Sequence, residues 1–193
     1  MMTLGLDVST SITGFSIIED GKLIYFNAVN TKNKKKFTSI NCVTEAIEEE
    51  LMQIKKIYKI DNIYIEESLK SFARNSTANT IILLSQINAL VTWVCFKIFN
   101  VEPIHVSAIS MRSKLGIDTK TAVNPGDPKP SSAQRRKKTK QAVLNHVQSI
   151  YSEFVCDINR AGNIKEDYYD MADAIVVAMF GNGVRAVGKT KNP

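Results

Sequence analysis

The chain has 193 residues, 44% of them hydrophobic, and its 25 Lys and Arg residues outnumber its 19 Asp and Glu residues. This length and apolar content predict one globular domain with a sizeable core. The three cysteines lie far apart without a CxxC spacing, which argues against a zinc site and for reduced thiols in a cytosolic protein. Polar Ser85, Gln86 and Asn88 interrupt the longest apolar helix and no signal peptide precedes the first strand, so we expect a soluble, intracellular protein without a membrane span.

The first predicted strand covers residues 3–8 and contains one carboxylate, Asp7. A charge inside a buried strand is costly unless a cation meets it, so Asp7 indicates a metal or phosphate site. The alternative is an aspartate that closes a turn through its own backbone. Two further strands, Thr13–Glu19 and Lys22–Ala28, form a hairpin around Asp20-Gly21, so three antiparallel strands open the fold.

A helix and a fourth strand come next. Apolar residues recur with the helical period from Phe37 to Ile57, and an apolar strand, Asn62–Glu67, ends in two glutamates. A helix between two strands usually makes a right-handed parallel crossover, which places the end of this strand beside Asp7. Because successive side chains point to opposite faces, only one glutamate can approach Asp7; we favour Glu66, which lies deeper in the strand, with Glu67 as the alternative.

The following helix, Thr77–Ile98, is apolar over more than one face. So wide an apolar surface must be covered by more than one sheet face. A homodimer interface is one explanation, and packing wholly inside the domain, between the sheet and neighbouring helices, is the other. A fifth strand, Val101–Val106, and a short helix from Ser107 that carries Arg112 and Lys114 complete this half of the chain.

The excess positive charge is concentrated in one segment. Residues 118–130 hold three prolines and no apolar period, which predicts a loop, and Gln134–Ile150 predicts a helix with a basic first half. Such a concentration indicates a polyanionic partner such as nucleic acid phosphates, although a solvated charged face is the more frequent origin of a charge run. Between residues 119 and 140, one acidic residue, Asp127, accompanies seven basic residues: Lys120, Lys129, Arg135, Arg136, Lys137, Lys138 and Lys140.

The last predicted helix covers Glu166–Phe180. Asp170 and Asp173 are three residues apart, so both project from one face of this helix. Asp173 directly precedes the apolar run 174–180, so two like charges lie close to buried surface. This arrangement is costly, and a divalent cation relieves it.

Four carboxylates therefore come from three separate elements: Asp7, Glu66, Asp170 and Asp173. Ligand sets made only of oxygen atoms suit hard cations such as Mg²⁺ or Mn²⁺. An acidic cluster that faces a basic surface is what metal-assisted phosphodiester hydrolysis requires, with two ions about 4 Å apart. The residues thus predict a metal-dependent nuclease.

The order of these elements resembles the ribonuclease-H-like superfamily, and within it the RuvC-type Holliday junction resolvases. The resemblance extends from Thr3 to Phe180. Each motif is short, and it is their order and separation that make the resemblance specific. The motifs are Leu4-Gly-Leu-Asp7 followed by Thr13-Gly14-Phe15, then Ile65-Glu66, Ala73-Arg74-Asn75, and Asp170-Met-Ala-Asp173-Ala174.

This resemblance implies an α/β fold with a mixed five-stranded sheet, three antiparallel strands and then parallel ones, flanked by helices. It implies a nuclease domain over residues 1–181 with a basic loop-and-helix insertion at 118–140, and a flexible basic tail at 182–193. It also implies a homodimeric endonuclease that binds four-way DNA junctions and resolves them by paired symmetric nicks. The catalytic metal ligands, for two Mg²⁺ ions that Mn²⁺ can replace, would be Asp7, Glu66, Asp170 and Asp173, and the helix from Thr77 would form the dimer interface.

Contacts with DNA are less clearly assigned by the resemblance. An aromatic residue after the catalytic glutamate helps to open the junction in this family, and Phe72 is the candidate, with Leu69 as a competitor because the spacing from Glu66 is longer here. Ser9 stands where the family usually has glycine. These departures and the compact length suggest a phage, viral or organellar relative that acts wherever its DNA lies. The expected DNA contacts are Phe72, Arg74, Lys114, Arg135, Arg136, Lys137 and Lys138, the last five from charge alone.

Three other function classes stay open. The same fold and carboxylates also serve nucleases that act on RNA or on other branched DNA, and a non-catalytic junction-binding protein would share the basic surface. A strand with aspartate followed by a Ser/Thr-rich hairpin also resembles the phosphate-binding start of sugar-kinase and actin-like folds. That class needs a second nucleotide-binding half, which 193 residues do not supply, so we expect no nucleotide cofactor.

Overall fold

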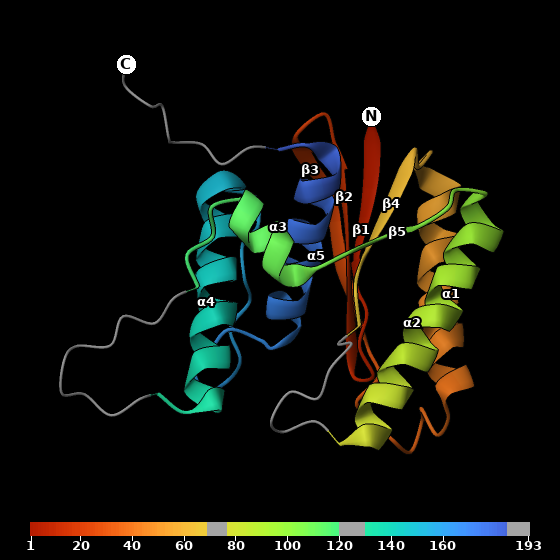
Figure 1. Cartoon of the computed structure of the whole chain (residues 1–193), viewed down its shortest axis with the longest axis horizontal. Coiled ribbons are helices and arrows are strands. Elements are labelled where there is room, and N and C mark those ends of the chain that lie inside the picture. Colours follow the sequence, from red (N-terminus) through yellow and green to blue (C-terminus); the bar gives the residue numbers. More distant parts are fainter. Residues whose placement is uncertain (69–76, 120–129, 185–193) are drawn as a thin grey trace.

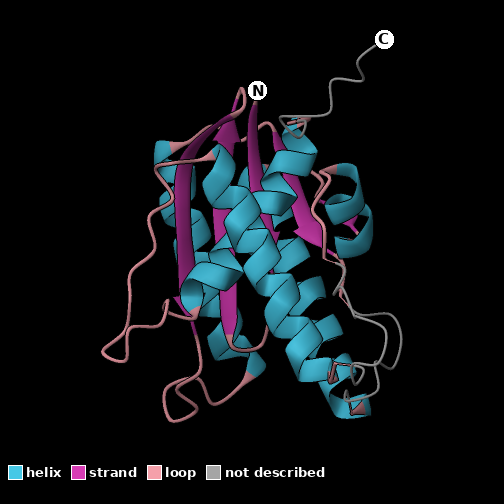
Figure 2. Ribbon diagram, turned by 90° about the vertical axis from the view of Figure 1, so that its left-hand side faces the viewer, coloured by secondary structure: helices cyan, strands magenta, loops and turns pink. Residues whose placement is uncertain are grey.

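The computed structural model describes residues 1–68, 77–119 and 130–184, which form three layers (Figure 1). Helices α1 and α2 cover one face of the sheet and helices α3, α4 and α5 cover the other, and Figure 2 shows the second layer crossing in front of the strands. The strands are β1 (Met2–Asp7), β2 (Ile12–Glu19), β3 (Lys22–Asn30), β4 (Asn62–Glu66) and β5 (Ile104–Val106). The helices are α1 (Ile40–Ile57), α2 (Ala78–Phe99), α3 (Ala108–Lys114), α4 (Ser132–Ile150) and α5 (Asp167–Asn182).

The sheet has the strand order β3-β2-β1-β4-β5. Strand β2 pairs antiparallel with β1 and β3, while β4 pairs parallel with β1 and β5. The predicted mixed sheet, three antiparallel strands followed by parallel ones, is therefore confirmed. In the parallel pair Leu6 lies opposite Ile65, so the next residues, Asp7 and Glu66, are the last residues of their strands and lie side by side at the same end of the sheet.

Several predicted boundaries were wrong for identifiable local reasons. Helix α1 begins at Ile40 rather than Phe37, because the Ser39 hydroxyl accepts a hydrogen bond from the Cys42 amide and caps the helix there. Strand β5 begins at Ile104 rather than Val101, since Pro103 has no amide hydrogen to give to a strand ladder. Strand β3 extends beyond Ala28 to Asn30. These shifts leave the order of elements unchanged.

Helix α5 lies unusually close to strands β1 and β2. An added Cβ at Gly5 would lie 2.5 Å from the Ala178 amide nitrogen and 2.6 Å from the Ala174 carbonyl oxygen. An added Cβ at Gly14 would lie 2.2 Å from the carbonyl oxygen of Asp170. Glycine at both positions thus lets the helix that carries two carboxylates rest directly on the strands beside Asp7.

We expect Gly5→Ala to lower the free energy of unfolding by about 3 kcal/mol, because the new methyl group meets backbone atoms that cannot rotate away. Replacing Ala178 with glycine as well should not restore stability, since the nearest atoms belong to the α5 backbone and not to the Ala178 side chain. Denaturant unfolding of both variants and the single Ala178→Gly control measures this. Recovery in the double variant would show that side-chain volume, and not backbone approach, sets the spacing.

Candidate active site

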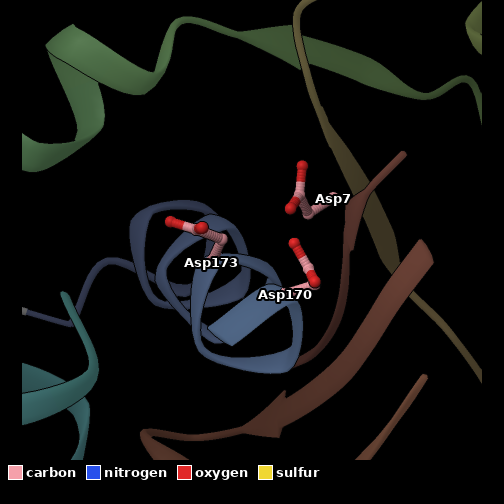
Figure 3. A group of neighbouring side chains, drawn as sticks. All are labelled: Asp7, Asp170 and Asp173. Atoms are coloured by element: carbon pink, nitrogen blue, oxygen red, sulfur yellow. The ribbon is translucent and has the colours of Figure 1, made fainter. Parts of the chain in front are cut away.

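Four carboxylates meet at the edge of the sheet where β1 and β4 end. Among the described residues, Asp7, Asp170 and Asp173 each offer a carboxylate oxygen, and these atoms lie within 4.8 Å of one another. Figure 3 shows Asp7 reaching from the end of β1 toward Asp170, with Asp173 on the next turn of α5. Glu66 lines the same cavity of about 740 Å³. The structure therefore brings together all four residues that the sequence singled out.

Two of the carboxylates are buried, two are half-buried, and they repel one another. Asp170 and Asp173 are only 9% and 6% exposed. Burial raises the pKa of Asp7 well above its ordinary value, and the charges of Glu66, Asp173 and Asp170 raise it further. Burial and the charge of Asp173 raise the pKa of Glu66 to about 7. The cluster is therefore held at a cost that a bound cation would remove.

Glu66 and Glu67 were both candidates for the ligand on β4, and both line the cavity. Glu66 is close enough to Asp7 for its charge to raise the pKa of that carboxyl group. The backbone carbonyl of Glu66 also accepts a hydrogen bond of 3.1 Å from the side-chain amide of Asn88, a buried residue of α2. This bond ties the end of β4 to the helix layer behind it.

Two basic side chains that the sequence did not assign to the site reach into the cluster. Arg112 of α3 donates a hydrogen bond of 3.1 Å to Asp173, and Lys140 of α4 donates one of 2.8 Å to Asp170. Their side chains are only 22% and 32% exposed. Although burial raises the pKa of Asp170 and Asp173, these two cations oppose the rise.

The periodicity of α4 contains a signal for Lys140. This residue lies three and seven positions before Val143 and Val147, which are both buried, so it belongs to the inward face of the helix. The prediction treated Lys140 only as one charge of the basic segment 119–140 and did not assign it to the inward face of the helix. Arg112 lies one position after buried Met111 on a short helix, and no comparable sequence signal points it toward Asp173.

The basic start of α4 forms one wall of the cavity. Arg135 and Arg136 line it, and both are exposed to solvent. Lys137 and Lys138 are exposed on the same helix. The cavity is thus lined by carboxylates and, on the side of α4, by exposed guanidinium groups.

Among the described residues, Lys114 is a predicted DNA contact that does not line this cavity. Lys114, at the end of α3, has its ammonium group 4.4 Å from the centre of the Phe180 ring, near the end of α5 that lies away from the carboxylates. Phe72, Arg74 and the competing Leu69 lie outside the described residues. Their assignment to DNA stays a prediction.

The residues present fit a hard divalent cation. All the candidate ligand atoms of the cluster are carboxylate oxygens, the donors that Mg²⁺ and Mn²⁺ prefer, and they belong to buried groups that repel one another without a cation. Arg112 and Lys140 supply part of the compensating charge, from the side of the cluster that faces α3 and α4.

Comparison with known proteins identifies the fold. No protein-family model and no curated protein sequence matches the chain. RuvC of Thermus thermophilus, solved in complex with a Holliday junction substrate, aligns with a TM-score of 0.60 and 13% identity over 93% of this chain and 91% of that chain. The chain has the ribonuclease-H-like fold of RuvC. The resemblance to RuvC-type resolvases is thus confirmed at the level of the fold.

Two further solved structures are similar. A second structure of Thermus thermophilus RuvC gives a TM-score of 0.59 at 13% identity over 93% of this chain and 92% of that chain. The yeast mitochondrial Holliday junction resolvase Ydc2 is 14% identical over 93% of this chain and 77% of that chain, with a TM-score of 0.49. The fold comparison rests on the two RuvC structures.

The raised pKa of Glu66 predicts a pH-dependent stability. A carboxyl group whose pKa rises from 4.5 to about 7 on folding stabilises the folded state fully below pH 4.5 and loses this contribution as the pH rises through 7. The loss amounts to about 3 kcal/mol. We therefore expect metal-free protein to be less stable at pH 8 than at pH 5, and Glu66→Gln to reduce the difference by its own share while Asp7, whose pKa is also raised, keeps the rest. Thermal unfolding in EDTA at both pH values measures this, and an equal pH dependence in both proteins would contradict it.

Proposed function

We propose that the protein is an endonuclease that depends on a divalent metal ion and resolves four-way DNA junctions by hydrolysing one phosphodiester bond in each of two strands. The observation that carries the proposal is the cavity in which Asp7, Glu66, Asp170 and Asp173 face the arginines of α4. A cluster of carboxylates at least half-buried favours metal-assisted hydrolysis, and exposed guanidinium groups at the cavity favour a substrate rich in phosphates.

The carboxylates and the arginines of the cavity have different proposed roles. When bound, divalent cations activate a water molecule and stabilise the charge that develops on the phosphate. Asp7, Glu66, Asp170 and Asp173 would hold these cations, Mg²⁺ or Mn²⁺, with two ions per site as part of the proposal. Arg135 and Arg136 would neutralise phosphates next to the cleaved bond.

Four-way DNA is proposed as the substrate because RuvC, which has the same fold, was solved in complex with a Holliday junction substrate. A fold does not by itself determine a substrate. For this reason RNA–DNA hybrids and other branched DNA belong in the same experiment. The exposed arginines of α4 that line the cavity suit a polyanion of any of these kinds.

The proposal includes a homodimer, because paired nicks require two active sites. In the single chain, α2 leaves four large apolar side chains 40–58% exposed: Ile82, Leu83, Trp93 and Phe96. This exposure contradicts the alternative that α2 packs wholly within the domain. Trp93 lies eleven residues after Ile82, and Phe96 lies three residues after Trp93. This spacing places all three side chains on one face of the helix. We propose that this face packs against the same face of a second copy.

Helix α2 is also long and apolar enough to cross a membrane, judged by length and composition alone. Core helices pass the same test, and α2 contacts the sheet layer through buried Ile87, Val91 and Val94. Only 28% of the most apolar 18-residue stretch of α2 is buried, which agrees with a second apolar face that a partner could cover.

The test is cleavage of a synthetic four-way DNA junction beside a linear duplex, a three-way branch and an RNA–DNA hybrid, in Mg²⁺, Mn²⁺ or EDTA. Paired nicks in the junction that require the metal ion are the expected result. Cleavage of the hybrid or the three-way branch in place of the junction would keep the chemistry and reassign the substrate. Junction binding without cleavage in any metal would indicate a non-catalytic binding protein.

A further inference from the structure

The connection from β3 to α1 carries a second concentration of positive charge. It contains Lys32 and three consecutive lysines, Lys34, Lys35 and Lys36, and the sequence has no acidic residue from Thr31 to Thr44. Lys32 forms an ion pair with Glu166, so its charge is already compensated. The three consecutive lysines, called the lysine arm below, are exposed and take no part in the carboxylate cluster.

The lysine arm is attached to the rim of the active-site cavity. Buried Thr31 donates a backbone hydrogen bond of 2.7 Å to the Ser11 carbonyl, and the Lys34 ammonium group lies 3.3 Å from the Thr10 carbonyl oxygen. Both acceptors belong to the β1–β2 loop, which starts directly after Asp7. Since Ser9 of this loop lines the cavity, the arm is bonded to a loop that forms part of the cavity wall.

A hydrogen-bonded turn orders the backbone of the arm. The side-chain oxygen of Asn33 accepts a hydrogen bond of 3.1 Å from the Lys35 amide, and its carbonyl accepts bonds of 3.0 and 2.8 Å from the amides of Lys36 and Phe37. The lysines are therefore presented from a defined turn. A preorganised cluster of cations binds a polyanion with a smaller entropic cost than a flexible segment does.

The two basic surfaces lie on opposite sides of the carboxylates. Figure 1 places the first turns of α1 and α4 at the same end of the molecule and on opposite faces of the sheet, with the end of β1 between them. The lysine arm precedes α1, and Arg135 and Arg136 lie in the first turns of α4. A phosphate backbone that crosses the carboxylates from α4 therefore continues toward the arm.

We propose that the lysine arm is a second phosphate-binding surface, which holds the nucleic acid backbone on the side of the cavity opposite α4. The carboxylates between the two surfaces repel phosphates, so a strand held on one side only would swing away from them. Cations on both sides keep the strand across the cluster. This inference rests on the proposed function only in taking nucleic acid as the partner of the cavity.

The test compares two triple variants that lose the same charge. Lys34→Gln/Lys35→Gln/Lys36→Gln removes the arm, and Lys55→Gln/Lys56→Gln/Lys59→Gln removes three exposed lysines at the opposite end of α1. Binding of a labelled four-way junction is measured in EDTA between about 50 and 300 mM KCl. We expect the arm variant to bind about tenfold more weakly or worse, with a salt dependence less steep by about 2 to 3 in the log–log slope, while the control changes little.

Equal losses of affinity in the two triple variants would overturn the inference, because they would reflect net charge alone. Binding of the junction by the arm variant with wild-type affinity would also overturn it. A second measurement avoids substitutions. Acetylation of lysines in the wild-type protein, with and without the junction, should show protection of Lys34, Lys35 and Lys36 and none of the control lysines. If the wild type binds but cleaves no junction, the proposed function fails while a protected arm still supports this inference.

Discussion

Asp7→Asn is expected to lower the rate of junction cleavage by about a thousandfold or more while junction binding persists. The substitution keeps the shape of the side chain and removes one charged ligand from the cluster, which costs several kcal/mol of transition-state stabilisation in metal-assisted hydrolysis. Because Asp7 is buried among three other carboxylates that raise its pKa, the neutral amide should also raise the unfolding temperature of the metal-free protein. Activity and stability thus change in opposite directions.

Three measurements on the same preparation check this: single-turnover cleavage in Mg²⁺, junction binding in EDTA, and thermal unfolding with and without Mn²⁺. The wild type should gain stability from Mn²⁺, and Asp7→Asn should gain little. The matched control is Asp157→Asn, which changes an exposed aspartate paired with Lys165 outside the cavity. Unchanged cleavage by Asp7→Asn would remove this carboxylate from the mechanism, and loss of binding as well would indicate a folding defect.

Trp93→Glu/Phe96→Glu is expected to weaken self-association by about a hundredfold or more, because large aromatic side chains dominate the energy of an interface and buried carboxylates repel. The wild-type residues are 58% and 45% exposed in the single chain, so the change should leave the fold intact. With the sites uncoupled, cleavage of a junction extruded in a plasmid should give nicked circles in place of linear product.

Sedimentation measures the oligomeric state, and Val155→Glu is the control for a new charge on an exposed apolar residue. Val155 is 71% exposed and lies in the connection between α4 and α5, helices that cover the face of the sheet opposite α2. The control should remain dimeric and give linear product. A wild type that sediments as a monomer at all concentrations, yet produces paired nicks, would rule out α2 as the dimer interface.

The order of elements and the four carboxylates of the site could be predicted from the sequence. Asp7 ends a strand that is buried on both faces and Glu66 ends a strand that alternates, and the crossover rule brings parallel strand ends together. Asp170 and Asp173 follow from the spacing of one helical turn. These rules depend only on residues that are near in sequence, so they need no knowledge of how the layers pack.

The basic side chains that complete the site come from distant elements and could be assigned only from the packing of the helices. Arg112 and Lys140 reach the carboxylates because α3 and α4 pack beside α5, and no periodicity specifies that packing. Likewise, the close approach of α5 at Gly5 depends on contacts between residues more than 150 positions apart. The lysine arm lies beside the cavity because Thr31 bonds to the β1–β2 loop. Long, flexible cationic side chains carry a charge whose place in space is set by non-local packing, and a sequence pattern records only the charge.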